Sequence, residues 1–509
     1  MKWIIILSII SLTFYSCGGS NTIQYPEPSS SAKDGSFYSK AATFEFGEKK
    51  YQADYGTITV PENRSKAKSR LIYLPVIRIH SSTENVNDPL FGLSGGPGMS
   101  NMKFPPVDSL LYDHDFVIVG YRGVDGSTVL DCPEVSAAFG NGGDDDLLSE
   151  QSLREIGEAW RKSVNRFKSL GIDLNGYTIP ETVEDMEAVR KVLKYKRINL
   201  ISESYGTRVA YIYGLMHPEI IHRSVMIGVS PPGRFVYDPQ ITDKQIEYYS
   251  RLWVKDSVMS KRCSDLASAM QKVLKSMPKK WFIFSINPGK VKIVTFALLF
   301  QRNTAAIVFD SYAAAEKGDY SGLALMSIAF NYVFPDMFVW GDLATKAVSI
   351  DFDSTKIFST IDQPGEPLGS SMDKLLWEPL KYYHFPIEMI PDSLRTFVNS
   401  NVETLILSGS IDFSTPAECG KEFLTYLKNG KQVIISEAGH VGDILYLQPD
   451  ATNALIADYI NKGVVDTSKL KYVPMDFKVN WGFPEIAKAA IGIAGLIVIL
   501  LAAGAVLLF

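Results

Sequence analysis

The chain has 509 residues, of which 46% are hydrophobic and 21% charged, and this composition excludes a mainly disordered or fibrous protein. Its 51 Lys and Arg against 56 Asp and Glu give a formal net charge of −5. Nucleic acid is therefore not expected as a partner, because a polyanion needs a basic surface. Four cysteines in a chain of this length exclude a disulfide scaffold.

Residues 1–17 have the pattern of an export signal. A basic start leads into the apolar run 4–10, and Cys17 stands directly before Gly-Gly-Ser. The segment resembles a bacterial lipoprotein signal, in which the cysteine is lipidated and becomes the new N-terminus. The pair Phe14-Tyr15 departs from the small or aliphatic pair usual there. Ordinary cleavage near Gly18 and an uncleaved anchor stay open as alternatives.

Short apolar runs after a polar linker predict β-strands. The linker, residues 18–41, contains Pro26, Pro28 and a run of serines. The strands are expected at 55–60, 71–79, 89–93 and 116–121. The last two runs are unbroken and lead into glycine-containing loops, which suits strands buried on both faces of a parallel sheet.

Strand and helix signals then alternate along the chain. Val183, Met186 and Val189 recur at helical spacing, with Thr182 as the expected N-cap. A strand at 198–201, a helix at 205–216 and a strand at 224–228 follow, and strands at 404–408 and 431–435 come after a break. The alternation predicts an α/β fold with a mostly parallel central sheet and right-handed crossovers.

Residues 233–395 interrupt this alternation with helical stretches rich in large aromatic side chains. Most of these side chains are expected to form the segment's own core; they are Trp281, Phe282, Phe284, Phe300, Phe330, Tyr332, Phe334, Phe338 and Trp340. We interpret the segment as an inserted, mainly helical lid between two parts of the core, residues 42–232 and 396–463.

The C-terminal end predicts a membrane anchor. A polar spacer, residues 464–487, precedes the segment 488–509, in which 489–509 carries no charge and no proline. A helix of that length spans about 31 Å, enough to cross a hydrocarbon core. A transmembrane helix is expected, with membrane lipid as a partner. The globular part would then be exported and anchored in a bacterial cell envelope, on the periplasmic or extracellular side.

The candidate nucleophile lies between a buried strand and a helix. The sequence Ser202-Glu203-Ser204-Tyr205-Gly206 matches the nucleophile elbow G-x-S-x-G, with Ser202 in the first glycine position. Small flanking residues are needed because the serine of an elbow sits in a strained turn. Ser204 is therefore the expected nucleophile.

A serine nucleophile needs a base and an orienting carboxylate. Asp412 follows the strand at 404–408 and His440 follows the strand at 431–435, so both stand where an open α/β sheet places its site. The order Ser, Asp, His is the one expected of such a fold. Asp443 and Glu437 are the alternative acids.

The oxyanion hole needs two backbone N–H groups aimed at the developing charge. One is expected from Tyr205, directly after the nucleophile. The other is expected from Gly96, in the loop Gly95-Gly96-Pro97-Gly98 that follows an early buried strand.

These blocks together resemble the α/β-hydrolase family of prolyl aminopeptidases and tripeptidyl aminopeptidases, over roughly residues 45–465. The matching segments are 95–98, 120–127, 177–178, 183–190, 204–208, 409–412, 415–416 and 439–440. Gly120 and Asp125 are departures from the D-x-R-G-x-G-x-S block of the family. The tripeptidyl branch is the more similar one, because of Ser-Tyr-Gly-Thr and the long lid.

The resemblance implies an α/β-hydrolase fold and cleavage of peptides from a free N-terminus, with acidic residues holding the substrate ammonium. Glu203, beside the nucleophile, and Asp319, between lid helices, are the candidates. The alternatives are a buried carboxylate that fixes the elbow and a helix cap. No metal-ligand spacing such as H-E-x-x-H occurs, and neither a metal nor another cofactor is expected.

Three functions stay open. The leading one is a tethered serine exo-peptidase that forms an acyl-enzyme with peptide substrates. The second is a carboxylester hydrolase with the same triad, whose aromatic lid accepts acyl chains. The third is a non-catalytic, exported binding protein of the same fold. Export also permits a Cys132–Cys263 disulfide between core and lid, with Cys419 left as a buried free thiol.

Overall fold

The computed structural model describes residues 24–84, 86–140, 146–353 and 366–506. The expected leader with Cys17, and residues 507–509 at the end of the expected membrane helix, lie outside the described residues.

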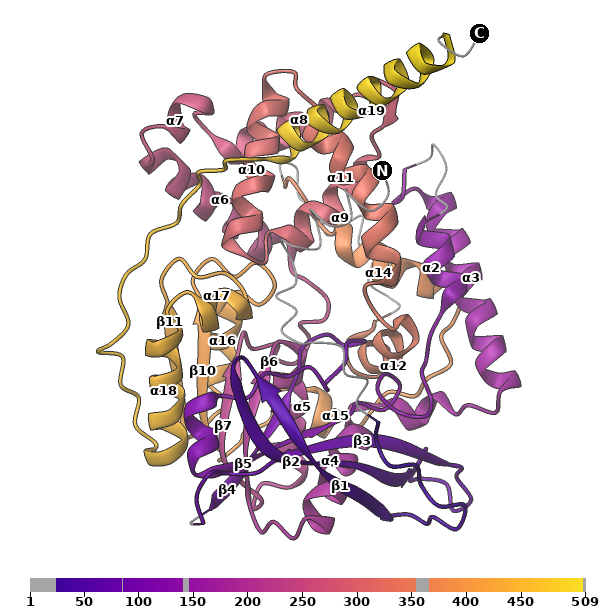
Figure 1. The fold of residues 1–509 in the computed structure, drawn as a ribbon, viewed down its shortest axis with the longest axis vertical. Helices are drawn as coiled ribbons and strands as arrows, with labels where there is room; N and C mark the ends of the chain where they lie inside the picture. Colours follow the sequence, from indigo (N-terminus) through magenta and orange to yellow (C-terminus); the bar gives the residue numbers. More distant parts are fainter. Residues whose placement is uncertain (1–23, 85, 141–145, 354–365, 507–509) are drawn as a thin grey trace.

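A nine-stranded sheet forms the base of the molecule, in the order β1-β2-β3-β5-β4-β6-β7-β10-β11 (Figure 1). Its strands are β1 (Phe37–Phe46), β2 (Lys49–Pro61), β3 (Leu71–Ile79), β4 (Asn87–Leu93), β5 (His114–Val119), β6 (Ile198–Glu203), β7 (Ile221–Ile227), β10 (Glu403–Gly409) and β11 (Gly430–Ile435). The pairs from β5 through β4 to β11 are parallel, while β1, β2 and β3 join by antiparallel pairing. The predicted mostly parallel sheet is therefore present.

Alternate side chains of the strands fill two separate cores, one on each face of the sheet. Val117 and Val119 of β5 pack among α4 (Ile179–Val192), α5 (Tyr205–Met216) and α16 (Ala417–Leu424). Phe116 and Ile118 of the same strand face the other side, where the covering elements are η1 (Asp108–Tyr112), α17 (Val441–Tyr446) and α18 (Pro449–Lys462). The core is thus a three-layer α/β/α arrangement.

Several predicted boundaries differ from the structure, among them those of β1 and α4. The strand β1 begins at Phe37, inside the expected linker, because its residues pair in register with β2 from Phe37↔Ile58 onward. The helix expected to begin at Thr182 begins at Ile179, after the N-cap Thr178. Thr182 lies inside the first turns, where its hydroxyl donates to the Thr178 carbonyl.

A helical insert, residues 233–395, stands above the C-terminal ends of the parallel strands (Figure 1). Its elements are α6 (Pro239–Lys255), α7 (Met259–Arg262), α8 (Leu266–Ser276), β8 (Lys280–Trp281), β9 (Phe284–Ser285), α9 (Pro288–Leu298), α10 (Arg302–Glu316), α11 (Ser321–Val333), η3 (Phe334–Asp336), α12 (Trp340–Asp351), α14 (Ser371–Tyr382) and α15 (Asp392–Arg395). Phe334 packs against both Phe330 and Trp340 in its core, as the sequence predicts. Phe282 and Tyr332 are exposed instead.

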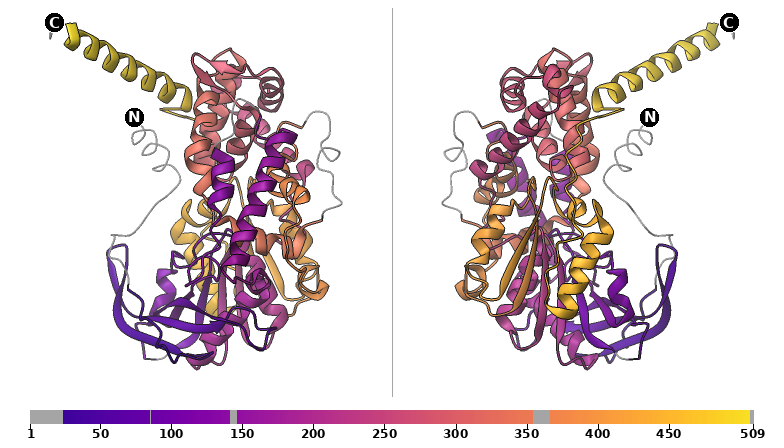
Figure 2. Two further views of the ribbon diagram at one scale, coloured as in Figure 1. Left: turned by 90° about the vertical axis from the view of Figure 1, so that its right-hand side faces the viewer. Right: turned by 90° about the vertical axis from the view of Figure 1, so that its left-hand side faces the viewer.

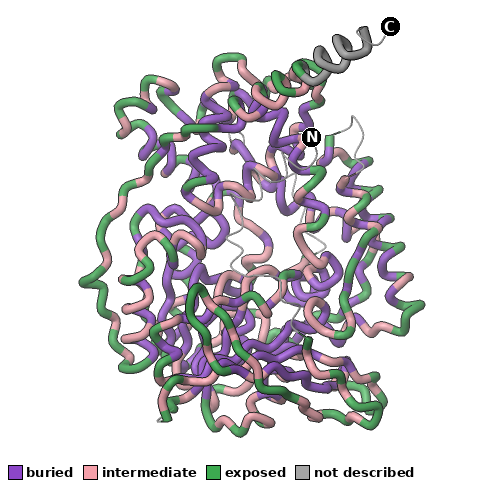
Figure 3. The backbone as a smooth tube through the Cα atoms, viewed as in Figure 1, coloured by how far each residue is buried: buried purple, intermediate pink, exposed green. Residues whose placement is uncertain are grey.

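The insert has partners that the sequence did not indicate. Helices α2 (Pro133–Gly140) and α3 (Glu150–Ser169), followed by η2 (Leu174–Tyr177), come from the first part of the core. Their apolar residues belong to the same buried cluster as those of the insert, and α3 packs along α14. Figure 3 shows the resulting two buried regions, one around the sheet and one among the helices.

Residues 464–482 form an extended strap from α18 to α19 (Phe483–Val506), which projects from the insert (Figure 2). The strap was expected to be a polar spacer, but Phe477 is buried among aromatic rings of the insert. Across the described ranges, no single helix is both long and apolar enough for a membrane span, and only the bent pair Ser321–Asp336 and Trp340–Asp351 passes when taken together. The expected transmembrane helix is thus not supported.

Candidate active site

Ser204 lies at a sharp turn between β6 and α5. Its backbone has φ 49° and ψ −119°, a conformation that non-glycine residues rarely adopt and that proteins retain mainly at functional sites. Its N–H donates to the Ile227 carbonyl of β7 (2.9 Å). Ser202, in the first glycine position of the motif, donates its hydroxyl to the Val225 carbonyl (3.0 Å), which explains why a serine is accepted there.

Asp412 and His440 form a fixed pair at the ends of β10 and β11. His440 Nδ1 lies 2.8 Å from Asp412 Oδ2, which also accepts the Thr415 hydroxyl (2.9 Å). The other carboxylate oxygen accepts the backbone N–H groups of Ser414 (2.9 Å) and Thr415 (2.8 Å). With Nδ1 donating to the carboxylate, the imidazole keeps Nε2 as its acceptor, which is the form that a general base requires.

The backbone brings this pair to the nucleophile. Gly228 directly follows Ile227, the residue that accepts the Ser204 N–H. A Cβ added at Gly228 would lie 2.9 Å from His440 Cε1, so the imidazole rests against this strand end. Ser204, Asp412 and His440 are therefore gathered at neighbouring ends of parallel strands, where the sequence analysis expected them.

The two alternative acids have other partners. Asp443 accepts the backbone N–H groups of Arg302 and Gly439 (both 2.9 Å), and burial raises its pKa. Glu437 accepts bonds from Tyr472 and Met475 in the strap (2.6 and 2.5 Å). Both shape the loop that carries His440 without contacting its imidazole in the described structure.

The predicted oxyanion loop adjoins the nucleophile. A Cβ at Gly95 would lie 3.2 Å from Ser204 Cβ, so Gly95, Gly96 and the first turn of α5 with Tyr205 enclose the same space. Asn101 braces the loop: its side chain accepts the Ser94 N–H (2.7 Å) and donates to the carbonyls of Gly92 and Val119.

A buried ion pair from the insert also holds this loop. Asp342 of α12 accepts the Gly98 N–H (3.1 Å) and pairs with Lys346, whose ammonium donates to the Arg122 carbonyl (3.1 Å). Burial raises the pKa of Asp342 and lowers that of Lys346, so each charge depends on the other. Sequence analysis missed both residues.

Two glycines let α12 come this close. Gly98 has φ +81°, and a Cβ there would lie 2.9 Å from the Val339 carbonyl. Gly123 has φ +85°, and a Cβ there would lie 2.5 Å from Asp342 Oδ1. Left-handed backbone and missing space together require glycine at both positions.

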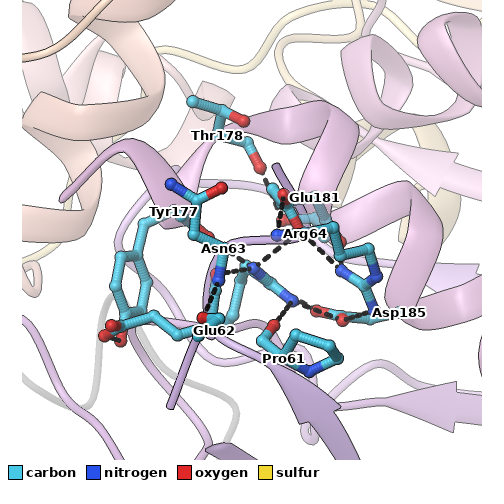
Figure 4. Close-up of polar contacts among 12 residues, drawn as sticks. Pro61, Glu62, Asn63, Arg64, Tyr177, Thr178, Glu181 and Asp185 are labelled. Atoms are coloured by element: carbon cyan, nitrogen blue, oxygen red, sulfur yellow. Dashed lines mark hydrogen bonds and ion pairs between the residues drawn. The ribbon is translucent and has the colours of Figure 1, made fainter. Parts of the chain in front are cut away.

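The segment 120–127 is a structural hub beside the site. Arg122 is fully buried and binds Asp185 of α4 through two bonds of 2.6 Å; Figure 4 shows Asp185 beside Glu181 and Arg64 in this network. Asp125, which replaces a glycine of the family's block, holds two loops together, because its carboxylate accepts the backbone N–H groups of Tyr121 (2.8 Å) and Asn101 (2.9 Å).

The two candidate ammonium-binding residues have different environments. Asp319 pairs with Lys488 of α19 (2.5 Å) and caps α11 through Ser321, so its carboxylate is committed to structure. Glu203 is half-buried beside Ser204, and within the part of the chain that the structure describes its carboxylate has no hydrogen-bond partner. Desolvation raises the pKa of Glu203 to about 7, while His440 acts in the opposite direction.

The expected Cys132–Cys263 disulfide is not formed. Both thiols are free and buried, and each donates to a nearby carbonyl, that of Leu130 and that of Asp265. Cys419 is likewise a buried free thiol. Among residues 24–84, 86–140, 146–353 and 366–506, no group of three His, Cys, Asp or Glu side chains is placed to hold a metal ion.

A family model described as the alpha/beta hydrolase fold matches residues 88–442. The chain belongs to this family. Over 193 residues this α/β hydrolase is also 28% identical to the tripeptidyl aminopeptidases of Streptomyces lividans and Streptomyces coelicolor. The match covers 35% of the chain and about a third of each relative, 36% and 35%.

Solved structures resemble this α/β hydrolase at low identity. An α/β hydrolase enzyme from a Medee basin deep-sea metagenome library is 14% identical, with a TM-score of 0.37, covering 78% of this chain and 97% of its own. An esterase from Exiguobacterium antarcticum is 13% identical, with a TM-score of 0.36, covering 79% and 98%.

Proposed function

We propose that the chain is a serine hydrolase that uses Ser204, His440 and Asp412. The observation that carries the proposal is the strained backbone of Ser204 at the end of β6, next to the end of β7 where the Asp412-bound imidazole rests against Gly228. Proteins rarely keep such backbone conformations without a functional reason.

The residues supply each step of acyl transfer. Ser204 Oγ attacks the substrate carbonyl while His440 Nε2 takes its proton, and Asp412 stabilises the resulting imidazolium. The N–H groups of Tyr205 and of the Gly95-Gly96 loop receive the oxyanion. His440 then donates the proton to the leaving group. In the second half, His440 takes a proton from water, the water oxygen attacks the acyl carbonyl, and His440 returns the proton to Ser204 Oγ as the acid is released.

We propose peptides with a free N-terminus as the substrates. The partial match to tripeptidyl aminopeptidases supports this choice. So does Glu203, a carboxylate without a described partner next to the nucleophile, since an ammonium group would compensate its buried charge.

An ester substrate is the second candidate, because a row of aromatic rings lies beside the base. Phe300 lies edge-on to His440 (5.5 Å between ring centroids), and Phe296 contacts both Phe300 and Phe413. Such a wall could also accept an acyl chain.

The test compares chromogenic mono-, di- and tripeptide amides with free and blocked N-termini, and a short-chain ester, using Ser204→Ala as the control. Turnover of free but not blocked peptides, lost in the control, supports the aminopeptidase. Ester turnover alone would move the assignment to an esterase. Failure of a serine-directed phosphonate to label the folded wild-type chain would overturn the hydrolase and leave the non-catalytic binding protein.

Export with a lipid anchor at Cys17 is a separate proposal, supported by the pattern of residues 1–17. Metabolic labelling with a radioactive fatty acid should mark the wild-type chain in the envelope fraction. An unlabelled Cys17→Ser chain is the matched control, and an unlabelled wild-type chain would contradict the anchor.

A further inference from the structure

The hairpin formed by β8 and β9 presents two large apolar side chains to solvent. Lys280 pairs with Ser285 and Trp281 with Phe284, so the turn consists of only Phe282 and Ile283. These two side chains are 72% and 71% exposed. The rings of Trp281 and Phe284 stack directly beneath them (6.2 Å between centroids) and support the tip.

The turn chemistry is unusual for a soluble surface. Two-residue hairpin turns that need a positive φ normally use Asn, Asp or Gly. Here Phe282 occupies that position with φ 54°, which strains its backbone. An exposed Phe282 gains little packing in return, so the local structure alone gives no reason for two bulky apolar residues at this place.

The surrounding sequence is basic. Residues 266–309 contain six Lys and one Arg but no Asp or Glu, in a chain whose net charge is −5. Lys272 and Lys275 in α8, and Lys279 and Lys280 beside the tip, are all exposed. None of these four lysines forms an ion pair with another described residue, so their charges face solvent.

The hairpin and the start of α19 contact the same helix, α11. Asn287, just after the hairpin, donates its N–H to Ser327 of α11 (3.0 Å). The start of α19 packs on the same helix, where Ser321 Oγ donates to the Pro484 carbonyl (3.5 Å). Figures 1 and 2 show α19 leaving the molecule on the insert side, away from the sheet.

We propose that the hairpin tip, Phe282 and Ile283 with Lys279 and Lys280, inserts into the headgroup region of a bilayer that contains anionic lipids. Apolar and aromatic side chains flanked by lysines are what such an interface binds, since the rings enter the acyl boundary and the ammonium groups meet phosphates. A two-residue protrusion forms no groove for a protein segment, which favours a lipid surface. The proposal does not rest on the catalytic assignment, and it goes beyond an anchor at either end of the chain.

The experiment places an environment-sensitive fluorophore on the tip of the full-length chain. Ile283→Cys is the test site and Lys68→Cys, exposed in the loop between β2 and β3, is the matched control. Both carry Cys17→Ser, and the cysteines 132, 263 and 419 are buried. Each labelled chain is mixed with phosphatidylglycerol or phosphatidylcholine vesicles, with and without nitroxide-labelled lipid, and each is checked for an unchanged Tm.

We expect a blue shift and nitroxide quenching at position 283 with phosphatidylglycerol, and neither at position 68. Lys279→Gln with Lys280→Gln should weaken insertion of the tip about thirtyfold, at ~1 kcal/mol per basic residue. A label at 283 that stays in water on vesicles would overturn the proposal. So would a blue shift that grows with protein concentration without vesicles, because it would assign the tip to a second copy of the chain.

Discussion

The strand ends and the helical insert hold their buried acids differently. At the strand ends, Asp412 accepts four hydrogen bonds from described residues, and its geometry leaves little freedom to His440. In the insert, burial raises the pKa of Asp243 to about 7, with nearby Glu366 acting in the same direction. The difference teaches that a buried carboxylate at the strand ends is surrounded by hydrogen-bond donors, whereas burial of Asp243 in the insert favours its protonated form.

Removing the nucleophile should have the largest effect. Ser204→Ala should lower kcat by about 10⁶-fold, and Asp412→Asn by about 10⁴-fold, because the asparagine leaves His440 in the wrong tautomer. Both variants should keep the wild-type Tm within a few degrees. Steady-state kinetics on the best chromogenic substrate measures the loss, and an active Ser204→Ala enzyme would remove Ser204 from the mechanism.

The Asp342–Lys346 pair links the two regions, so breaking it tests how much this buried contact stabilises the chain. Asp342→Asn or Lys346→Met should each cost about 3–5 kcal/mol of unfolding free energy, because each leaves an uncompensated buried charge. The double variant should recover most of this loss. Urea unfolding measures all three, and a double variant no more stable than the single ones would show that the charges do not compensate each other.

Glu203 should control how tightly peptides with a free N-terminus bind. The pKa of Glu203 is about 7, so the carboxylate is ionised above that pH, while a substrate α-amino group loses its charge near pH 8. KM should therefore be lowest between about pH 7 and 8. Glu203→Gln should raise KM about thirtyfold and flatten the acidic side of the profile.

A substrate with a blocked N-terminus is the control for this prediction. Its KM should respond little to Glu203→Gln. An equal rise for free and blocked substrates would instead assign Glu203 to the structure of the elbow.

The smallest effect is expected at Asp243. A pKa raised in the folded state means that the folded chain holds a proton which the unfolded chain has lost. This contribution to stability is present below pH 4 and is lost as the pH rises to about 7. Asp243→Asn should therefore stabilise the chain at pH 8, by about 2 kcal/mol, and have little effect at pH 4. Thermal melts of both chains across this range test it, and equal Tm shifts at both pH values would contradict the prediction.

The sequence predicted the elements whose signals are local. The strand β3 and the helix α5 were predicted with their observed bounds, because the first is a mostly apolar run framed by polar residues and the second follows the elbow motif and ends before Pro218. The positions of the candidate triad were predicted in the same way, since Ser204 directly follows β6 and Asp412 and His440 lie in the loops after β10 and β11. Their catalytic roles stay a prediction.

What the sequence missed depends on distant contacts. Asp342 and Lys346 have the i, i+4 spacing of an ordinary surface pair, and only the packing of α12 on two glycine loops makes them a buried pair. The glycines at 98 and 123 were the available signal. Nothing in the sequence of α2 and α3 indicated that these helices would pack with the insert. An oxidising compartment permits a disulfide, but it does not bring Cys132 and Cys263 together in the fold.

The strap of residues 464–482 connects α19 to the loop that carries His440. Glu437 accepts hydrogen bonds from Tyr472 and Met475 of the strap, and it lies three residues before His440 in the sequence. Phe477 is the next fixed point on the way to α19. A load applied at α19 would therefore be borne first by the contacts of α19 with α11 and its capping residue, including Lys488–Asp319, and then by Phe477 and Glu437. Only after these contacts had broken would tension reach the imidazole.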